Sequence, residues 1–304
     1  MSQEIINSPS FRATAPTLPG RIFGKSPKAS IVVSRKQDEI VSGSTLGLEG
    51  ITLSFGGVKA ISNVSFKISR GEIAAIIGPN GAGKSSLLNV INGVYQASSG
   101  TVSFEGYRFR NIRPLRAARL GIGRTFQHHA LFKQLTTLDN VLSGLTRHSK
   151  TTLVEHLLGL PRDRSETHEF LRRADEILTF LELQPYRNSV VSTLSYGVQK
   201  RIDFARALVG QPKLLLLDEP MAGMNAQEKQ EMSRFISETN RTYGTTIVLI
   251  EHDIGVVMNL SSHVIVLDNG RKIADGTPAE VRENQAVIDA YLGVSHHEPA
   301  EGDI

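Results

Sequence analysis

The glycine-rich stretch at residues 78–86, which reads GPNGAGKSS, constrains this chain more than any other feature. It fits the pattern G-x-x-x-x-G-K-[ST]. A β-like run at residues 72–77 leads into it, and a helix-like run at residues 86–91 leads out of it. A chance glycine-rich turn does not need this strand–loop–helix context, whereas a phosphate-binding loop does. The sequence therefore predicts an α/β domain that binds a nucleotide at this loop.

The residue types of the loop indicate its chemistry. Glycines let the backbone turn tightly and point its N–H groups inward, and the following helix directs its positive end to the same place. We expect Lys84 to reach the β- and γ-phosphates and the Ser85 hydroxyl to bind Mg²⁺, so the predicted cofactors are ATP and Mg²⁺. The residues expected to surround the nucleotide are Gly78, Pro79, Asn80, Gly81, Ala82, Gly83, Lys84, Ser85 and Ser86.

A pair of acids follows the apolar run LLLL at residues 214–217. An acid at the carboxyl end of a strand beside a phosphate loop is placed to hold Mg²⁺, usually through water, and we expect Asp218 to do so. Glu219 would point toward the attacking water and act as the general base. Acids at an ordinary turn are the alternative, but the phosphate loop in the same chain favours the catalytic interpretation.

The composition excludes several classes of protein. The 304 residues suffice for one large domain or two small ones, and the chain has no cysteine, which excludes disulfides and cysteine metal sites. No apolar run approaches the roughly 18 residues of a membrane span. The net charge of +4 comes from scattered bases, whereas nucleic-acid binding favours a clustered basic stripe. No nucleic-acid partner is therefore expected.

The pattern along the chain predicts its domain organisation. Residues 1–45 carry four prolines among serines, threonines and lysines, which predicts a disordered N-terminal extension; a transit peptide or a basic tail that binds anionic lipid is the alternative. Residues 46–294 form the predicted α/β domain, with an inserted helical block at about residues 130–210. A closing helix is expected at residues 278–291, and a loose tail at residues 295–304.

The stretch LSYGVQ at residues 194–199 precedes the acidic pair by about one helix. It resembles the Leu-Ser-Gly-Gly-Gln signature of the ATP-binding cassette (ABC) ATPases, with Tyr196 in place of the first glycine and Val198 in place of glutamine. The resemblance implies that Ser195 and Gly197 contact the γ-phosphate held by the opposite subunit. It also implies the ABC ATPase fold, a P-loop α/β core with an antiparallel β subdomain and an inserted α-helical subdomain.

Three further residues take roles from this resemblance. Phe55 lies upstream of the phosphate loop, where the family stacks an aromatic ring on adenine; a core phenylalanine is the alternative. Gln127 matches the glutamine that senses Mg²⁺ and the γ-phosphate, and His252 matches the histidine that contacts the γ-phosphate. The implied catalytic residues are Glu219, His252 and Gln127, and the implied metal-binding residues are Ser85, Gln127 and Asp218.

Several phrases narrow the resemblance to one group. Together they look like the ATPases of branched-chain amino acid uptake systems, the LivG-like group, although urea-transport ATPases share much of the pattern. The phrases are RTFQ at residues 124–127, LSYG at 194–197, AGMN at 222–225, IEHD at 250–253 and VIDAYLG at 287–293.

This resemblance implies an ATP-hydrolysing subunit that powers import of branched-chain or related amino acids. Two ATPase subunits, identical or different, would sandwich two ATP molecules. They would dock on transmembrane permease subunits at the cytoplasmic face of the inner (plasma) membrane, as peripheral subunits, and an extracytoplasmic substrate-binding protein would take part indirectly. A urea or amide importer ATPase is the alternative. A soluble ABC ATPase that acts on nucleic acid or ribosomes is a further one, but such proteins usually carry two cassettes or basic domains.

Overall fold

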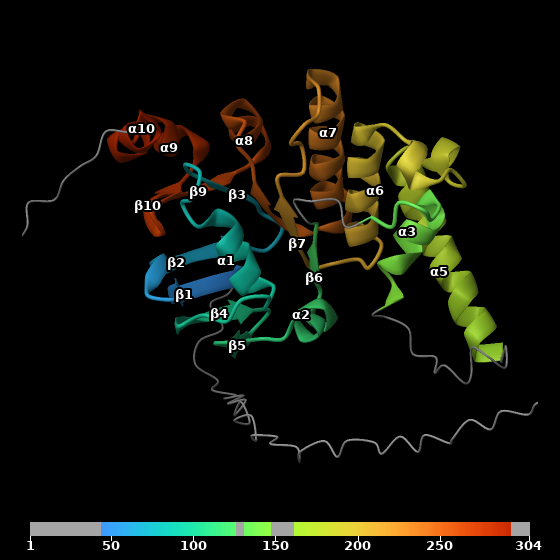
Figure 1. Cartoon of the computed structure of the whole chain (residues 1–304), viewed down its shortest axis with the longest axis horizontal. Helices are drawn as coiled ribbons and strands as arrows, with labels where there is room; N and C mark the ends of the chain where they lie inside the picture. Colours follow the sequence, from blue (N-terminus) through green and yellow to red (C-terminus); the bar gives the residue numbers. More distant parts are fainter. Residues whose placement is uncertain (1–43, 126–130, 147–160, 293–304) are drawn as a thin grey trace, which may run out of the picture. The chain divides into compact units, whose positions relative to one another are not determined.

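The computed structural model describes residues 44–125, 131–146 and 161–292 (Figure 1). All of them belong to one compact unit of the chain. Most of the predicted N-terminal extension, the whole predicted tail and Gln127 lie outside the described residues. Among the described helices, none is both long and apolar enough to cross a bilayer.

A six-stranded sheet lies at the centre of the described fold, with the strand order β10-β9-β3-β8-β7-β6. Neighbouring strands are parallel except for β10, which is antiparallel to β9. Every residue of β3, β7 and β8 is buried, because apolar clusters pack against both faces of the sheet. The strands are β3 (Ile73–Ile77), β6 (Ile122–Arg124), β7 (Leu214–Asp218), β8 (Thr246–Ile250), β9 (His263–Asp268) and β10 (Arg271–Gly276).

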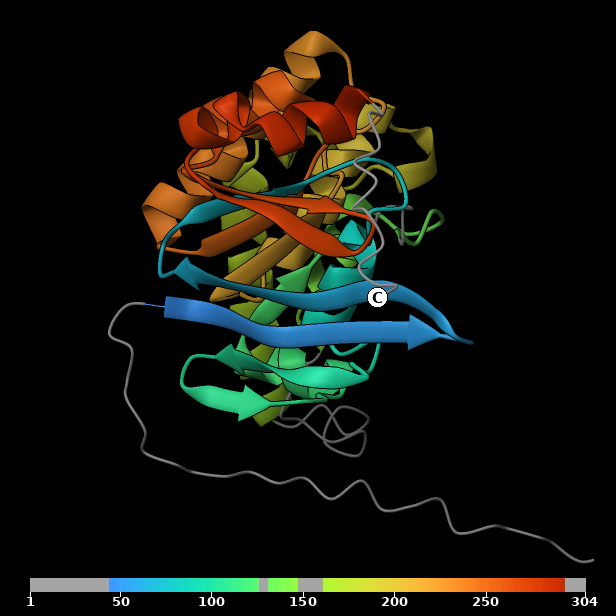
Figure 2. The ribbon, with the colours of Figure 1, turned by 90° about the vertical axis from the view of Figure 1, so that its left-hand side faces the viewer.

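A second, antiparallel sheet has the order β2-β1-β4-β5 (Figure 2). Its buried side chains form one core with α1 and with alternate residues of β3, such as Ala74 and Ile76, whereas Ala75 and Ile77 face the other core. This division follows from the two-residue period of a strand. The elements are β1 (Ser44–Phe55), β2 (Val58–Ser69), α1 (Lys84–Ile91), β4 (Ser99–Phe104), β5 (Tyr107–Phe109) and α2 (Pro114–Leu120).

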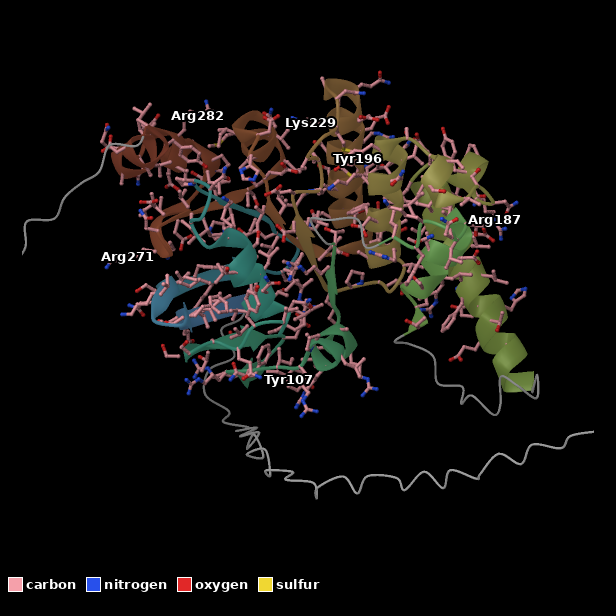
Figure 3. All side chains as sticks on the ribbon, viewed as in Figure 1. Tyr107, Arg187, Tyr196, Lys229, Arg271 and Arg282 are labelled. Carbon is pink, nitrogen blue, oxygen red and sulfur yellow. The ribbon has the colours of Figure 1, made fainter. Side chains whose placement is uncertain are left out.

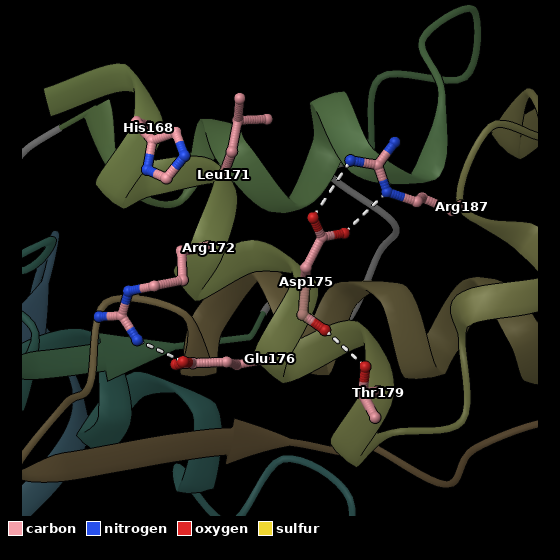
Figure 4. Close-up of a pocket in the computed structure, with 7 residues that line it drawn as sticks. All are labelled: His168, Leu171, Arg172, Asp175, Glu176, Thr179 and Arg187. Carbon is pink, nitrogen blue, oxygen red and sulfur yellow. Dashed lines mark hydrogen bonds and ion pairs between the residues drawn. The ribbon is translucent and has the colours of Figure 1, made fainter. Parts of the chain in front are cut away.

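The chain forms a helical block between β6 and β7, where the sequence pattern predicts one. The first helix, α3, begins at a capping box of Thr136 and Asp139 and packs on α5 and α6. The Arg187 guanidinium donates two hydrogen bonds of 2.7 and 3.2 Å to Asp175 of α5 and thereby lowers the pKa of that carboxyl (Figure 4). The elements are α3 (Thr137–Ser143), α5 (Pro161–Phe180), η2 (Gln184–Tyr186), η3 (Val191–Thr193) and α6 (Tyr196–Leu208).

The last part of the described chain departs from one prediction. The single closing helix expected at residues 278–291 is wrong, because the structure has two helices that meet at Asn284. Asn284 takes an extended backbone, and its side-chain oxygen accepts a hydrogen bond of 3.0 Å from the N–H of Ala286, which competes with helical hydrogen bonding. The helices after β7 are α7 (Ala226–Tyr243), α8 (Ile254–Leu260), α9 (Pro278–Glu283) and α10 (Gln285–Leu292).

His263 contacts two carboxylates at the β10 edge of the central sheet. His263 on β9 directs Nε2 to Oδ1 of Asp275 on β10 at 2.6 Å, and Nδ1 to Oε1 of Glu72 at 3.2 Å. Lys272 donates to the other Asp275 oxygen at 2.5 Å. The hydrogen bond to Asp275 raises the pKa of His263 above its ordinary value, although burial acts in the opposite direction. The β9–β10 hairpin is therefore held to β3 by charged groups as well as by its ladder.

Candidate functional site

The phosphate loop connects β3 to α1, as the sequence predicts. Two of its glycines lie against backbone from other elements. Gly78 has a φ of 144°, and a Cβ there would lie 2.0 Å from the carbonyl oxygen of Leu267 at the end of β9. Gly83 has a φ of 96°, and a Cβ there would lie 2.6 Å from the carbonyl oxygen of Ala60 on β2. Only glycine fits at these two positions, and the shape of the loop is fixed by this packing.

The Lys84 side chain folds back into the loop. Its ammonium donates hydrogen bonds of 2.7 Å to the carbonyl oxygen of Gly78 and 2.8 Å to that of Pro79. Burial lowers the pKa of Lys84, while the carboxylates of Glu219 and Asp218 act in the opposite direction. The loop thus encloses a positive charge whose present partners are neutral carbonyls, and a phosphate would be a stronger partner.

Asp218, the last residue of β7, has a different partner for each carboxylate oxygen. Oδ1 accepts a hydrogen bond of 3.2 Å from the Ser85 hydroxyl, and Oδ2 forms an ion pair of 3.0 Å with Arg124 on β6. Arg124 also donates a hydrogen bond of 2.6 Å to Asn89 on α1. Mg²⁺ prefers hard oxygen ligands, and the Ser85 hydroxyl and Asp218 Oδ1 supply two that converge. These residues fit a Mg²⁺ ion at this edge of the sheet.

Glu219 is held in an uncommon backbone conformation. Its φ is 50°, which is unusual for a residue other than glycine. Its N–H donates to the carbonyl oxygen of Ile250 at 3.0 Å, and its own carbonyl accepts from Lys200 at 3.0 Å. Its carboxylate oxygen Oε1 lies 2.6 Å from Nε2 of His252. The backbone is thus fixed on both sides, and the carboxylate points to the histidine that follows β8.

Glu251, a residue to which the sequence analysis assigns no role, supports this arrangement. It is buried, and its carboxylate accepts hydrogen bonds from the N–H of Met221 at 2.8 Å and from that of His252 at 3.3 Å. Burial raises the pKa of Glu251 above its usual range. One buried side chain therefore joins the segment after Glu219 to the segment that carries His252.

The signature segment lies at the start of α6. Ser195 caps that helix, and its hydroxyl oxygen accepts from the N–H of Val198 at 3.5 Å. Gly197 lies against Glu228 of α7, because a Cβ there would come within 2.2 Å of that carboxylate. The side chain of Gln199 donates to the carbonyl oxygen of Leu194 at 2.8 Å, so it supports the turn before the helix.

Tyr196, which replaces a glycine of the signature, packs on a second segment. Figure 3 places its side chain beside α6 and α7, and 43% of the residue remains exposed. Its ring covers Gly223, where a Cβ would lie 3.0 Å from the ring carbon Cε1. Gly223 has a φ of 77°. The signature therefore contacts the loop at residues 222–225 within the same chain.

Phe55 does not lie in the core, which was the alternative for this residue. It is 48% exposed at the end of β1, and its ring meets that of Tyr95 edge to face with the centroids 5.1 Å apart. An exposed aromatic face can accept a flat base. Tyr95 is a second aromatic residue at this place, and the sequence analysis assigns it no role.

The structure brings most of the predicted residues to one edge of the central sheet. Lys84, Ser85, Asp218, Glu219 and His252 lie there within the network of contacts given above. Ser195 and Gly197 are at the start of α6, and Figure 1 places α6 and α1 on opposite sides of β7. Farther along α6, Lys200 donates to the carbonyl oxygen of Glu219, so this helix also contacts the first group.

Comparison with known proteins decides the family. A family model described as an ABC transporter matches residues 61–222. The high-affinity branched-chain amino acid transport ATP-binding protein LivG of Salmonella typhimurium is 40% identical over 248 residues, which cover 82% of this chain and 97% of that protein. The chain belongs to the ABC transporter ATP-binding family.

Other comparisons agree with this ABC assignment. A model described as a branched-chain amino acid ATP-binding cassette transporter matches residues 271–297. A nucleotide-free cassette from an ABC transporter gives a TM-score of 0.72 at 33% identity and covers 82% of this chain and 98% of that one. A dimeric ATP-binding cassette with bound ADP and phosphate gives 0.66 at 26% identity and covers 77% and 98%.

The predicted ABC ATPase fold is therefore confirmed, with its antiparallel sheet and its helical block. ABC cassettes bind and hydrolyse ATP, and this chain is an ATPase of that family. ATP-binding subunits of this family dimerise and work with permease subunits of membrane transporters.

Proposed function

We propose that this chain is the ATP-hydrolysing subunit of an importer for branched-chain or related amino acids. The observation that carries the proposal is the match to the branched-chain cassette model over residues 271–297, together with 40% identity to LivG over most of the chain. The substrate would be recognised by partner proteins, since this subunit supplies the energy.

The nucleotide would occupy the phosphate loop. The backbone N–H groups of residues 81–86 and the Lys84 ammonium would bind its phosphates, which would replace the carbonyl partners that Lys84 now has. Phe55 would stack on the base. Ser85 and Asp218 would hold Mg²⁺, with Gln127 completing the set. A bound Mg²⁺ ion would neutralise charge on the phosphates.

Glu219 would remove the proton from the attacking water as the water oxygen forms its bond to the γ-phosphorus and the bond to the β–γ bridging oxygen breaks. Its short contact with His252 favours this role, because the histidine orients the carboxylate. His252 would then also contact the γ-phosphate. The fixed backbone of Glu219 means that little reorganisation is needed at the moment of reaction.

A second ATPase subunit, identical or related, would complete each site. Ser195 and Gly197 of one subunit would meet the γ-phosphate on the other, as the match of residues 194–197 to the ABC signature implies. ATP would stabilise the closed dimer, and hydrolysis would release it. The pair would bind permease subunits at the cytoplasmic face of the membrane.

The test of this site is the variant Glu219→Gln. We expect it to bind ATP as the wild type does but to lose turnover by at least about 100-fold, the usual contribution of a general base. ATP binding is measured by calorimetry and turnover by phosphate release. Normal hydrolysis by this variant would overturn the assignment of Glu219.

Glu182→Gln provides a matched control for this test. Glu182 is also a glutamate with positive φ, at 56°, but its carboxylate pairs with Arg234 on α7. We expect its turnover to equal that of the wild type. A similar loss in both variants would point to a general effect on folding instead of a catalytic one.

A further inference from the structure

Lys200 is a buried lysine to which the proposed mechanism assigns no role. It lies near the start of α6, the helix that Ser195 caps, and is 4% exposed. Its ammonium donates a hydrogen bond of 3.0 Å to the backbone carbonyl oxygen of Glu219. Burying an ammonium is costly unless polar or charged groups compensate for the lost water. The contact with Glu219 is therefore the first place to look for the role of this lysine.

The surroundings of Lys200 are acidic. It lines one small cavity together with Asp218 and Pro220, the residues on either side of Glu219. Burial lowers the pKa of Lys200, whereas the negative charge of four carboxylates acts in the opposite direction. These carboxylates belong to Asp203, Glu251, Glu219 and Asp218. The lysine thus offsets negative charge at the end of β7, where the expected Mg²⁺ ligand and general base follow each other.

The same ammonium also lies beside the signature segment. Its nitrogen is 5.8 Å from the centroid of the Tyr196 ring, which is within the range of a cation–π contact. Tyr196 precedes Lys200 by about one helical turn, so the two side chains are neighbours on α6. One buried cation therefore contacts both a residue of the signature and the backbone of Glu219.

The backbone of Glu219 needs such contacts. Its φ of 50° is unfavourable for a residue with a side chain, and such a conformation persists only where the surrounding structure imposes it. Pro220 follows, so the peptide unit between them has no N–H to anchor it. The carbonyl of this unit accepts from Lys200 and, at 3.3 Å, from the N–H of Ala222. Without the lysine, the turn to Ala222 would remain, but the peptide unit and the carboxylate attached to it would be less firmly oriented.

We propose that Lys200 is a positioning residue for Glu219, through which the signature helix α6 fixes the direction of the general base. This inference rests on the proposed function and adds one residue to its mechanism. Lys200 acts through the backbone of Glu219, and Glu219 acts on the attacking water. A base that is already oriented needs little reorganisation in the transition state, so the lysine contributes to kcat more than to ATP binding.

The test compares Lys200→Met with the wild type in the full chain. Methionine fills a similar volume but has no donor and no charge. We expect kcat to fall about 10-fold, the effect of losing one hydrogen bond from a charged donor, while the Kd for ATP stays within about 2-fold. Turnover is measured by phosphate release and the Kd by calorimetry.

A second variant keeps the test decisive if methionine prevents folding. Lys200→Gln retains a neutral and shorter donor, so it should show the same kind of change with a smaller loss of kcat. If the variant that folds has the kcat of the wild type, the inference is wrong. It is also wrong if the affinity for ATP falls as much as the turnover does.

Two comparisons separate this role from a general effect on α6. Arg201→Met is the matched control, because Arg201 is the next residue of the helix, its side chain is 15% exposed, and it pairs with Glu231 of α7 at 3.9 Å. Its turnover should equal that of the wild type, and a loss as large as that of Lys200→Met would contradict the inference.

The other comparison places Lys200→Met in a Glu219→Gln background. The residual turnover, followed with radiolabelled ATP, should fall no further, because the base that Lys200 orients is already absent. A further loss of about 10-fold would mean that Lys200 acts elsewhere, and it would overturn the inference. Normal turnover of Glu219→Gln alone would instead overturn the proposed general base.

Discussion

The buried ion pair between Arg124 and Asp218 should be important for stability before any nucleotide binds. The two side chains are only 6% and 3% exposed. Replacing Arg124 by methionine keeps much of the apolar volume but leaves the Asp218 carboxylate buried without its charged partner. Removing one partner of a buried pair costs about 3–5 kcal/mol, a large part of the roughly 5–15 kcal/mol that stabilises a domain.

This change can be measured by thermal unfolding of the nucleotide-free protein. At about 2–4 °C per kcal/mol for a domain of 150–250 residues, Arg124→Met should lower Tm by at least about 6 °C. Combining it with Asp218→Asn should cost less than the sum of the two single changes, because the uncompensated charge is then removed.

A matched surface pair supplies the control. Arg108 and Glu49 form an ion pair with side chains 60% and 50% exposed, so Arg108→Met should cost at most about 1 kcal/mol. If Arg124→Met lowers Tm no more than Arg108→Met does, burial does not make the loss of one charged partner more costly.

Two further predictions concern the edge of the sheet and the signature. Because its pKa is raised above 6.5 in the fold, charged His263 stabilises the protein fully below that pH, and this contribution is lost as the pH rises through the folded value. His263→Gln should therefore cost about 1 kcal/mol near pH 6 and progressively less at higher pH, and a urea-unfolding difference that grows with pH would contradict this. Gly223→Ala should cost about 1–2 kcal/mol through its left-handed backbone alone. The loss should be smaller in a Tyr196→Ala background, since the ring is what the new Cβ meets, and equal losses in the two backgrounds would contradict the packing argument.

Local patterns predict the nucleotide loop and the acidic pair well. The phosphate loop is a continuous segment between a strand and a helix, so its spacing alone indicates its conformation. Asp218 and Glu219 follow a buried strand, and parallel strands bring their carboxyl ends to the same edge of a sheet. That rule also places His252, which follows β8, next to Glu219.

The residues that the sequence analysis missed act over long separations in the chain. Arg124 reaches Asp218 because β6 pairs with β7, and Glu251 reaches Met221 because the segments after β7 and β8 lie together. Arg124 belongs to the RTFQ phrase at residues 124–127. A charged side chain on a strand buried beside β7 needs a partner of opposite charge, and this requirement could have pointed to the acid at the end of β7. The break between α9 and α10 at Asn284 was missed as well. A side chain that interrupts a helix by binding its own backbone gives only a weak signal in periodicity.

The most direct test of the central claim is ATP-driven uptake of labelled leucine into proteoliposomes. The vesicles would contain the permease subunits that co-purify with Glu219→Gln in the presence of ATP and Mg²⁺, together with the wild-type chain and the cognate binding protein. We expect uptake with the wild type and none when Glu219→Gln replaces it. Uptake of urea or an amide in place of leucine would contradict the amino-acid assignment, and uptake that does not depend on Glu219 would contradict the proposed mechanism.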